Sequence, residues 1–166
     1  MTESTTQSTT QSTTDSTAIE PVVATVVVPA DAATAFEIFT SGMGTWWPLA
    51  DFSLGADRIV AVEFDEHVGG EVREVWDDGT RRTWAAVLAW DPPRSLALAW
   101  GPGGFEVGRE PTRVEVTFTE IEPGTTQLRL VHTGWEVWAD EARETRDSYD
   151  SGWVVVLGGF TAKVTG

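Results

Sequence analysis

Most of the chain alternates apolar and polar residues with a period of two, the pattern of β-strands that bury one face. Short turns rich in Gly, Pro and Asp separate these segments at intervals of about ten residues, which predicts sequential antiparallel hairpins. The first segment is rich in Val and ends at Pro29. The strands predicted in this way are residues 21–28, 58–65, 71–76, 82–90, 95–100, 112–121 and 125–133.

The alternation also predicts which side chains point inward, if the apolar face of each strand is its buried face. A slip of one residue would turn every side chain of a strand to the opposite face. The predicted inward residues are Val60, Val62 and Phe64, then Trp84, Ala86, Leu88 and Trp90, then Leu96, Leu98 and Trp100, then Val114, Val116 and Phe118, and finally Leu128, Leu130 and His132.

Two segments instead have the three- and four-residue spacing of an amphipathic helix. The first is residues 31–40, with Asp31 as its expected N-cap. The second is residues 147–164, and a buried strand remains an alternative for its centre, because residues 153–157 are rich in Val and bounded by glycines. Gly158 and Gly159 would each cost a helix interior about 1 kcal/mol relative to Ala. The apolar stripe of the second helix would contain Tyr149, Trp153, Val156, Leu157, Phe160 and Val164.

An alternating sheet needs a layer that covers its apolar face, and the last helix is the expected cover. The pattern therefore predicts an α+β fold, with one curved antiparallel sheet and helices on its concave side. Residues 18–166 form the expected domain. Residues 1–17 contain only Ser, Thr, Gln and a few other mostly polar residues, so they are expected to form a disordered tail.

Aromatic composition and charge narrow the range of functions that the protein could have. The chain has nine Trp and one Tyr, which indicates a wide apolar interior or an apolar pocket. Trp46 and Trp47 are adjacent in a loop, where they either close the end of the core or line the mouth of a ligand site. The formal net charge is −15, which argues against nucleic-acid binding and against anionic membrane surfaces.

Other features suggest where the protein acts. The sequence has no Cys, so disulfides and thiolate chemistry are excluded, and a cytoplasmic location is expected. No apolar run approaches the ~20 residues of a membrane span, and no signal peptide is apparent at the N-terminus.

The acidic residues on the approach to the last helix indicate a solvated face, with a partner surface or a loose cation site as alternatives. These residues are Asp140, Glu141, Glu144, Asp147 and Asp150.

His132 and Glu74 are the two ionisable groups predicted to face inward. His132 could anchor a ligand carbonyl or hydroxyl, act as an acid or base, or be a hydrogen-bonded interior histidine. Glu74 would be buried if Val72 and Trp76 are, and a buried carboxylate must be paired, for example with Arg82, Arg113 or Arg129. Its strand could equally lie at an edge or bury the other face. The second histidine, His67, is far away in a turn, so a metal site is not predicted.

A set of motifs, in order along residues 20–164, resembles the START-like (SRPBCC) superfamily, in its subgroup related to the C-terminal domain of activators of the Hsp90 ATPase. The resemblance implies a helix-grip fold, in which the sheet wraps the C-terminal helix and an apolar cavity lies between them. It also implies that Gly158 and Gly159 allow a close approach to the helix. The motifs are PADAATAF (29–36), WWP (46–48), VGGEV (68–72), WDDGT (76–80), VLAWDPP (87–93), TRVEVTF (112–118), LVHTGW (130–135) and GWVVVL (152–157).

The favoured function is therefore the binding of a small apolar or amphipathic molecule in this cavity, without a cofactor and without catalysis. One alternative is an enzyme of the polyketide cyclase or hydrolase kind, with His132 and Glu74 as acid and base. The other is a protein-interaction domain of the Hsp90-activator kind, with a chaperone as partner and the cavity filled by its own side chains. The residues expected around the ligand are Trp46, Trp47, Glu74, Trp84, Trp100, Phe118, His132, Trp153 and Phe160.

Overall fold

The fold comes from a computed structural model that describes residues 18–101 and 109–166. The tail predicted over residues 1–17, and most of the Gly/Pro loop between the fifth and sixth strands, lie outside the described residues. Within the described part, no helix is both long and apolar enough to cross a membrane.

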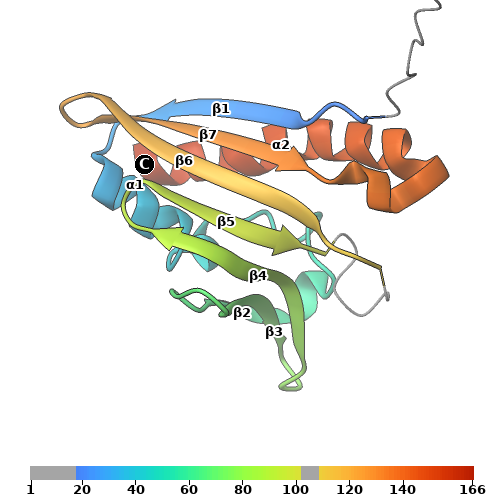
Figure 1. Ribbon diagram of the computed structural model, residues 1–166. Coiled ribbons are helices and arrows are strands. Elements are labelled where there is room, and N and C mark those ends of the chain that lie inside the picture. Colours follow the sequence, from blue (N-terminus) through green and yellow to red (C-terminus); the bar gives the residue numbers. More distant parts are fainter. Residues whose placement is uncertain (1–17, 102–108) are drawn as a thin grey trace, which may run out of the picture.

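Seven strands form one curved antiparallel sheet in the order β1-β7-β6-β5-β4-β3-β2 (Figure 1). Each pair except β1 and β7 joins neighbours in the sequence, as the predicted hairpins require. The strands are β1 (Val22–Val28), β2 (Ile59–Phe64), β3 (Glu71–Trp76), β4 (Arg81–Asp91), β5 (Ser95–Trp100), β6 (Thr112–Glu122) and β7 (Thr125–Thr133).

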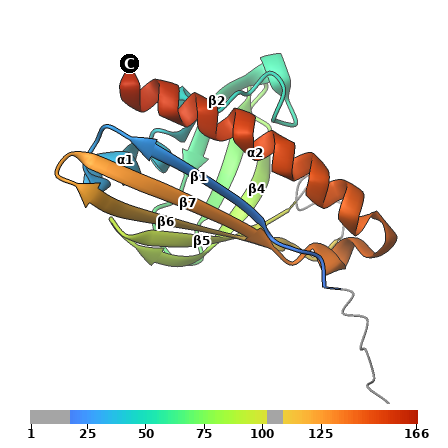
Figure 2. The same ribbon diagram turned by 90° about the horizontal axis from the view of Figure 1, so that it is seen from above.

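The long helix α2 (Ala142–Thr165) crosses the concave face of this sheet (Figure 2). It confirms the helical interpretation of the last segment and begins before the predicted residue 147. Its buried residues include Trp153, Val156, Leu157 and Phe160, which form the predicted stripe. The predicted α+β helix-grip fold is therefore confirmed.

The remaining helices are short. Helix α1 (Ala32–Phe39) begins where the Asp31 carboxylate accepts a hydrogen bond from the Thr34 backbone N–H at 2.7 Å, as the N-cap prediction requires. Two single 3₁₀ turns, η1 (Met43–Thr45) and η2 (Ala56–Arg58), flank the loop that follows α1. Another 3₁₀ segment, η4 (Trp135–Glu141), leads from β7 into α2.

Two strands depart from the predicted alternation because each contains a β-bulge. The register shifts between Ile59 and Ala61 in β2, and between Val87 and Ala89 in β4. A bulge adds one residue to its strand, so the side chains beyond it change face. Val60 and Leu88 are therefore exposed, by 66% and 45%, and their predicted inward orientation is wrong.

One half of the space between sheet and helix is a close-packed aromatic core. The Phe39 ring of α1 lies 5.5 Å from Phe160 of α2 and 5.6 Å from Phe118 of β6, measured between ring centroids. Trp46 closes this cluster, with its ring 5.3 Å from Phe160. A Cβ atom on Gly159 would lie 2.7 Å from the Trp46 carbonyl oxygen, so this glycine allows the close approach that the resemblance implies. A Cβ atom on Gly158 would meet nothing within 4 Å, so the same expectation is wrong for Gly158.

Candidate functional site

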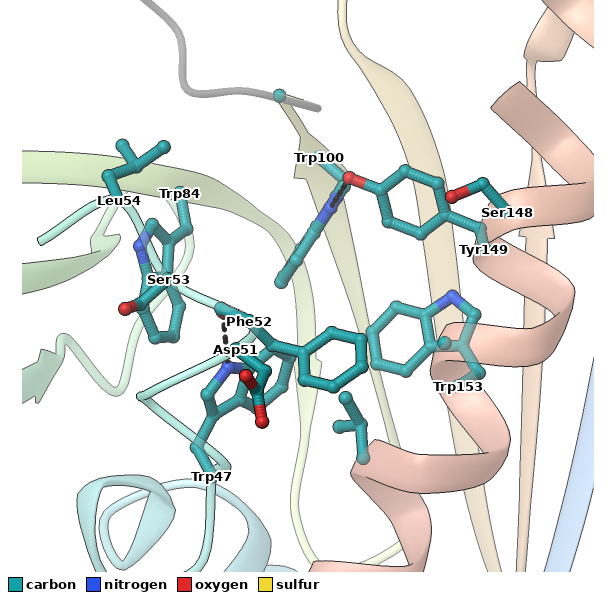
Figure 3. Close-up of a pocket in the computed structure, with 13 residues that line it drawn as sticks. Trp47, Asp51, Phe52, Ser53, Leu54, Trp84, Trp100, Ser148, Tyr149 and Trp153 are labelled. Carbon is teal, nitrogen blue, oxygen red and sulfur yellow. Dashed lines mark hydrogen bonds between the residues drawn. The ribbon is translucent and has the colours of Figure 1, made fainter. Parts of the chain in front are cut away.

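The other half of the space, beside residues 148–156 of α2, contains a cavity of about 340 Å³. Residues from the loop after α1, from β4 and β5 and from α2 form its walls, and Figure 3 shows their side chains converging. The described lining residues are Trp47, Asp51, Phe52, Ser53, Leu54, Trp84, Trp100, Gly101, Ser148, Tyr149, Gly152, Trp153 and Val156.

Four tryptophans dominate the walls, and we call them the cavity indoles: Trp47, Trp84, Trp100 and Trp153. Neighbouring rings among them have centroids between 5.1 and 6.5 Å apart and are tilted or perpendicular, the arrangement that aromatic pairs prefer. They hold one another in place from the loop, the sheet and the helix. The aromatic wall is therefore largely preformed.

Glu74 lies behind the wall and its side chain is fully buried, as its strand position predicted. One carboxylate oxygen, Oε2, accepts hydrogen bonds from Trp84 Nε1 at 2.6 Å and from the Leu54 backbone N–H at 3.0 Å. The other, Oε1, accepts from Trp76 Nε1 at 2.6 Å. Glu74 thus ties the loop that carries Leu54 to the Trp84 wall, and it is not itself among the lining residues.

The loop between Trp47 and η2 forms one side of the cavity, and local bonds shape it. Trp47 Nε1 donates to the Phe52 carbonyl at 2.8 Å, and the Phe52 N–H donates to the Pro48 carbonyl at 3.0 Å. The Ser53 hydroxyl donates to the Leu49 carbonyl and accepts from the Ala56 N–H. The sequence predicts only a loop here, because local bonds of this kind leave no periodic pattern of apolar residues.

His132 is fully buried behind Trp153 and does not line the cavity. Trp153 Nε1 donates to its Nδ1 at 3.0 Å, so the ring proton resides on Nε2, which donates to the Thr112 hydroxyl at 2.7 Å. The Thr112 hydroxyl in turn donates to the Trp100 carbonyl at 3.1 Å. Burial lowers the His132 pKa to about 3, so the ring is neutral near pH 7.

Tyr149 on α2 is a lining residue that sequence reasoning assigned to the helix stripe and not to the site. Its hydroxyl oxygen accepts a hydrogen bond from Trp100 Nε1 at 3.3 Å. Within the described part of the chain, the hydroxyl proton has no acceptor of its own. Burial raises the Tyr149 pKa, so this hydroxyl stays protonated near neutral pH and can donate to a bound molecule.

The structure therefore separates the nine predicted site residues into three groups. The cavity indoles line the cavity, whereas Glu74 and His132 lie behind it and hold the wall. Trp46, Phe118 and Phe160 are packed in the aromatic core around α1, because Phe39 and its neighbours fill that half of the space. The Tyr149 hydroxyl thus takes the polar position in the cavity that the sequence predicts for His132.

Fold and site together define a helix-grip protein with an aromatic cavity that opens to solvent between the sheet and the helix. Residues 29–164 match the family described as activator of Hsp90 ATPase homolog 1-like protein, and the chain belongs to this family. The START-like resemblance predicted from the motifs is thus confirmed. No curated protein matches the chain significantly.

Several solved structures share the fold. The self-sacrificing resistance protein CalC from Micromonospora echinospora is 28% identical, with a TM-score of 0.67 over 87% of this chain and 94% of CalC. The anthrahydroquino-γ-pyrone synthase Txn09 is also 28% identical, with a TM-score of 0.59 over 87% of this chain and 97% of its own. An Aha1 dimer from Colwellia psychrerythraea is 14% identical, with a TM-score of 0.62 over 88% and 96%, which shows the fold alone.

Proposed function

We propose that the protein binds a small, largely apolar aromatic molecule in the cavity between β4, β5 and α2. The observation that carries the proposal is the cavity itself: about 340 Å³ of space, open on one side and lined by the four cavity indoles together with Phe52 and Tyr149. Ligand pockets have volumes of about 300–1,000 Å³ and combine apolar walls with a few polar groups. The volume is at the lower end of this range, which favours a molecule of two or three fused rings over a larger one.

The Tyr149 hydroxyl is the proposed polar anchor. As a donor without a described acceptor, it would bind a carbonyl or phenolic oxygen of the ligand. One solved relative at 28% identity is named as a synthase of an anthrahydroquino-γ-pyrone, a molecule that combines fused rings with such oxygens. This relative supports the class of ligand proposed here.

The other two functions that the sequence left open have less support. Acid–base catalysis by His132 and Glu74 would require both groups to reach one point in the cavity. Both lie behind the wall, and their hydrogen-bonding atoms already have protein partners. An interaction domain with its cavity filled by side chains would leave little space between sheet and helix, in contrast to the volume observed here.

Isothermal titration calorimetry with acridone, a neutral three-ring ketone, tests the proposal. Gly152 lines the cavity and faces the Phe52 ring, whereas a Cβ atom on Gly158 would meet nothing within 4 Å. Gly152→Leu should therefore fill the cavity and weaken binding about tenfold or more, a loss of about 1.4 kcal/mol. Gly158→Leu makes the same change on the same helix and should leave the affinity unaltered.

Two results would contradict the proposal. One is the absence of acridone binding to the wild-type protein at its solubility limit. The other is equal affinity in wild type and in a folded Gly152→Leu variant, because a probe that binds elsewhere does not sense the filled cavity. Circular dichroism of both variants establishes that they are folded.

A further inference from the structure

The cavity indoles offer their ring surfaces to a ligand and not their N–H groups. Trp47 Nε1 donates to the Phe52 carbonyl and Trp100 Nε1 to the Tyr149 hydroxyl. The other two donate outward from the cavity, to Glu74 and to His132. Indole faces carry a negative quadrupole potential, and they attract cations. The walls are therefore electrostatically suited to a positive charge.

Asp51 adds a formal negative charge at this site. It is the one charged residue among the described residues that line the cavity, and Figure 3 shows its side chain among them. Within residues 18–101 and 109–166 its carboxylate has neither an ion-pair partner nor a hydrogen-bond donor. It is solvent-exposed, so it would mark the entrance and not the interior.

The net charge of the chain also favours a cationic ligand. The formal net charge is −15, so the field around the molecule attracts cations and repels anions. Aromatic faces, an unpaired carboxylate and a negative field all favour the same kind of ligand. None of the described lining residues is Lys, Arg or His, so no described cationic side chain at the cavity opposes this preference.

We infer that the cavity selects cationic aromatic molecules, such as planar ring systems that carry a protonated or quaternary nitrogen, and that Asp51 is a specificity-determining residue. This inference rests on the proposed function, since it specifies the ligand class of the same cavity. The ring system would stack among the cavity indoles while its positive charge lies toward Asp51. Neutral rings of the same shape would bind more weakly, and anionic ones weakest.

Three probes of one shape and different charge test the inference by calorimetry: N-methylacridinium, acridone and anthracene-2-carboxylate. The cation should bind about two- to threefold more tightly than the neutral ketone, because a cation–π contact and one exposed ion pair outweigh the hydrogen bond that only the ketone can accept from Tyr149. Asp51→Asn should weaken cation binding about two- to fivefold and leave acridone binding unchanged. The Asp51 side chain makes no described hydrogen bond, so the variant should melt at the wild-type temperature.

Asp57→Asn is the matched control, because Asp57 is an exposed aspartate of the same loop region that does not line the cavity. It removes the same charge and should leave the affinity for the cation unaltered. The inference is overturned if acridone binds as tightly as the cation, if Asp51→Asn has no effect, or if both variants weaken the cation equally. In these cases acridone binding still supports the proposed function. If no probe binds, both the inference and the proposed function fail.

Discussion

Replacing Glu74 by Gln should destabilise the protein, because three N–H donors face its two buried carboxylate oxygens. Gln keeps the shape of Glu but replaces one oxygen by an NH₂ group. If that group takes the place of Oε1, it faces the donor Trp76 Nε1–H. In the other orientation it faces two donors, Trp84 Nε1–H and the Leu54 N–H. In either orientation the new NH₂ group faces at least one N–H donor, so no hydrogen bond can form between them.

The less costly orientation loses the bond from Trp76 and leaves the other two without a charged acceptor. A hydrogen bond to a charged group contributes about 1.5–3 kcal/mol, and a neutral one about 1 kcal/mol. The lost bond thus costs about 1.5–3 kcal/mol and each weakened bond about 0.5–2 kcal/mol, so the expected loss is about 2.5–7 kcal/mol in the free energy of unfolding. For a domain of this size that corresponds to a melting temperature lower by roughly 5–28 °C.

Urea unfolding at pH 7, followed by tryptophan fluorescence, measures this loss. Glu66→Gln is the matched control, because Glu66 is an exposed carboxylate in the turn between β2 and β3. Its midpoint should stay at the wild-type value. A Glu74→Gln variant that unfolds within about 0.5 kcal/mol of wild type would refute the reasoning, since it would mean that these hydrogen bonds contribute almost nothing.

Three further predictions concern the helix, its buried histidine and the tail. The folded-state pKa of His132 is lowered to about 3, so the neutral ring contributes its full stability above the unfolded pKa near 6.5, and this contribution declines as the pH falls toward 3. Between pH 7 and pH 5, wild type should therefore lose about 2 kcal/mol more free energy of unfolding than His132→Gln, measured by urea unfolding at each pH. Gly158→Ala should stabilise the domain by up to about 1 kcal/mol, whereas Gly159→Ala should destabilise it by about 1–3 kcal/mol, because its new Cβ atom would contact the Trp46 carbonyl. Thermal melts that rank the two variants the other way would contradict the packing described here. Deleting residues 1–17 should leave the melting temperature within about a degree, and a drop of several degrees would mean that the tail contacts the domain.

Strand faces could be predicted from the sequence wherever the strands are regular. Alternation placed Leu98, Val116 and Leu130 inward, and all three are buried. It could not place Val60 or Leu88, because a bulge changes the face of a strand without a clear signal in the apolar pattern. The same alternation left open whether Glu74 faces inward, and it could not identify the partners of its carboxylate, since they depend on where the loop and the neighbouring strand meet.

The location of the cavity along the helix could not be predicted either. Trp153 and Phe160 belong to one helical stripe, and the sequence gives no reason to separate them. The difference comes from α1, whose Phe39 packs against Phe160 and fills that half of the space. Tyr149 lies beyond the reach of α1, and its hydroxyl is directed toward Trp100. A cavity is thus a property of the tertiary packing, and periodicity indicates only which face can contain it.

The central claim is that aromatic molecules bind among the cavity indoles, and the indole N–H region of a ¹H–¹⁵N correlation spectrum tests it most directly. Nine tryptophans should give nine assignable signals, and acridone is then titrated into the labelled protein. The account predicts that the signals of the four cavity indoles shift together, with one affinity, while the signals outside the cavity stay in place. It is contradicted if acridone leaves the cavity indoles unshifted, or if the largest shifts occur at Trp90 and Trp138, which do not line the cavity.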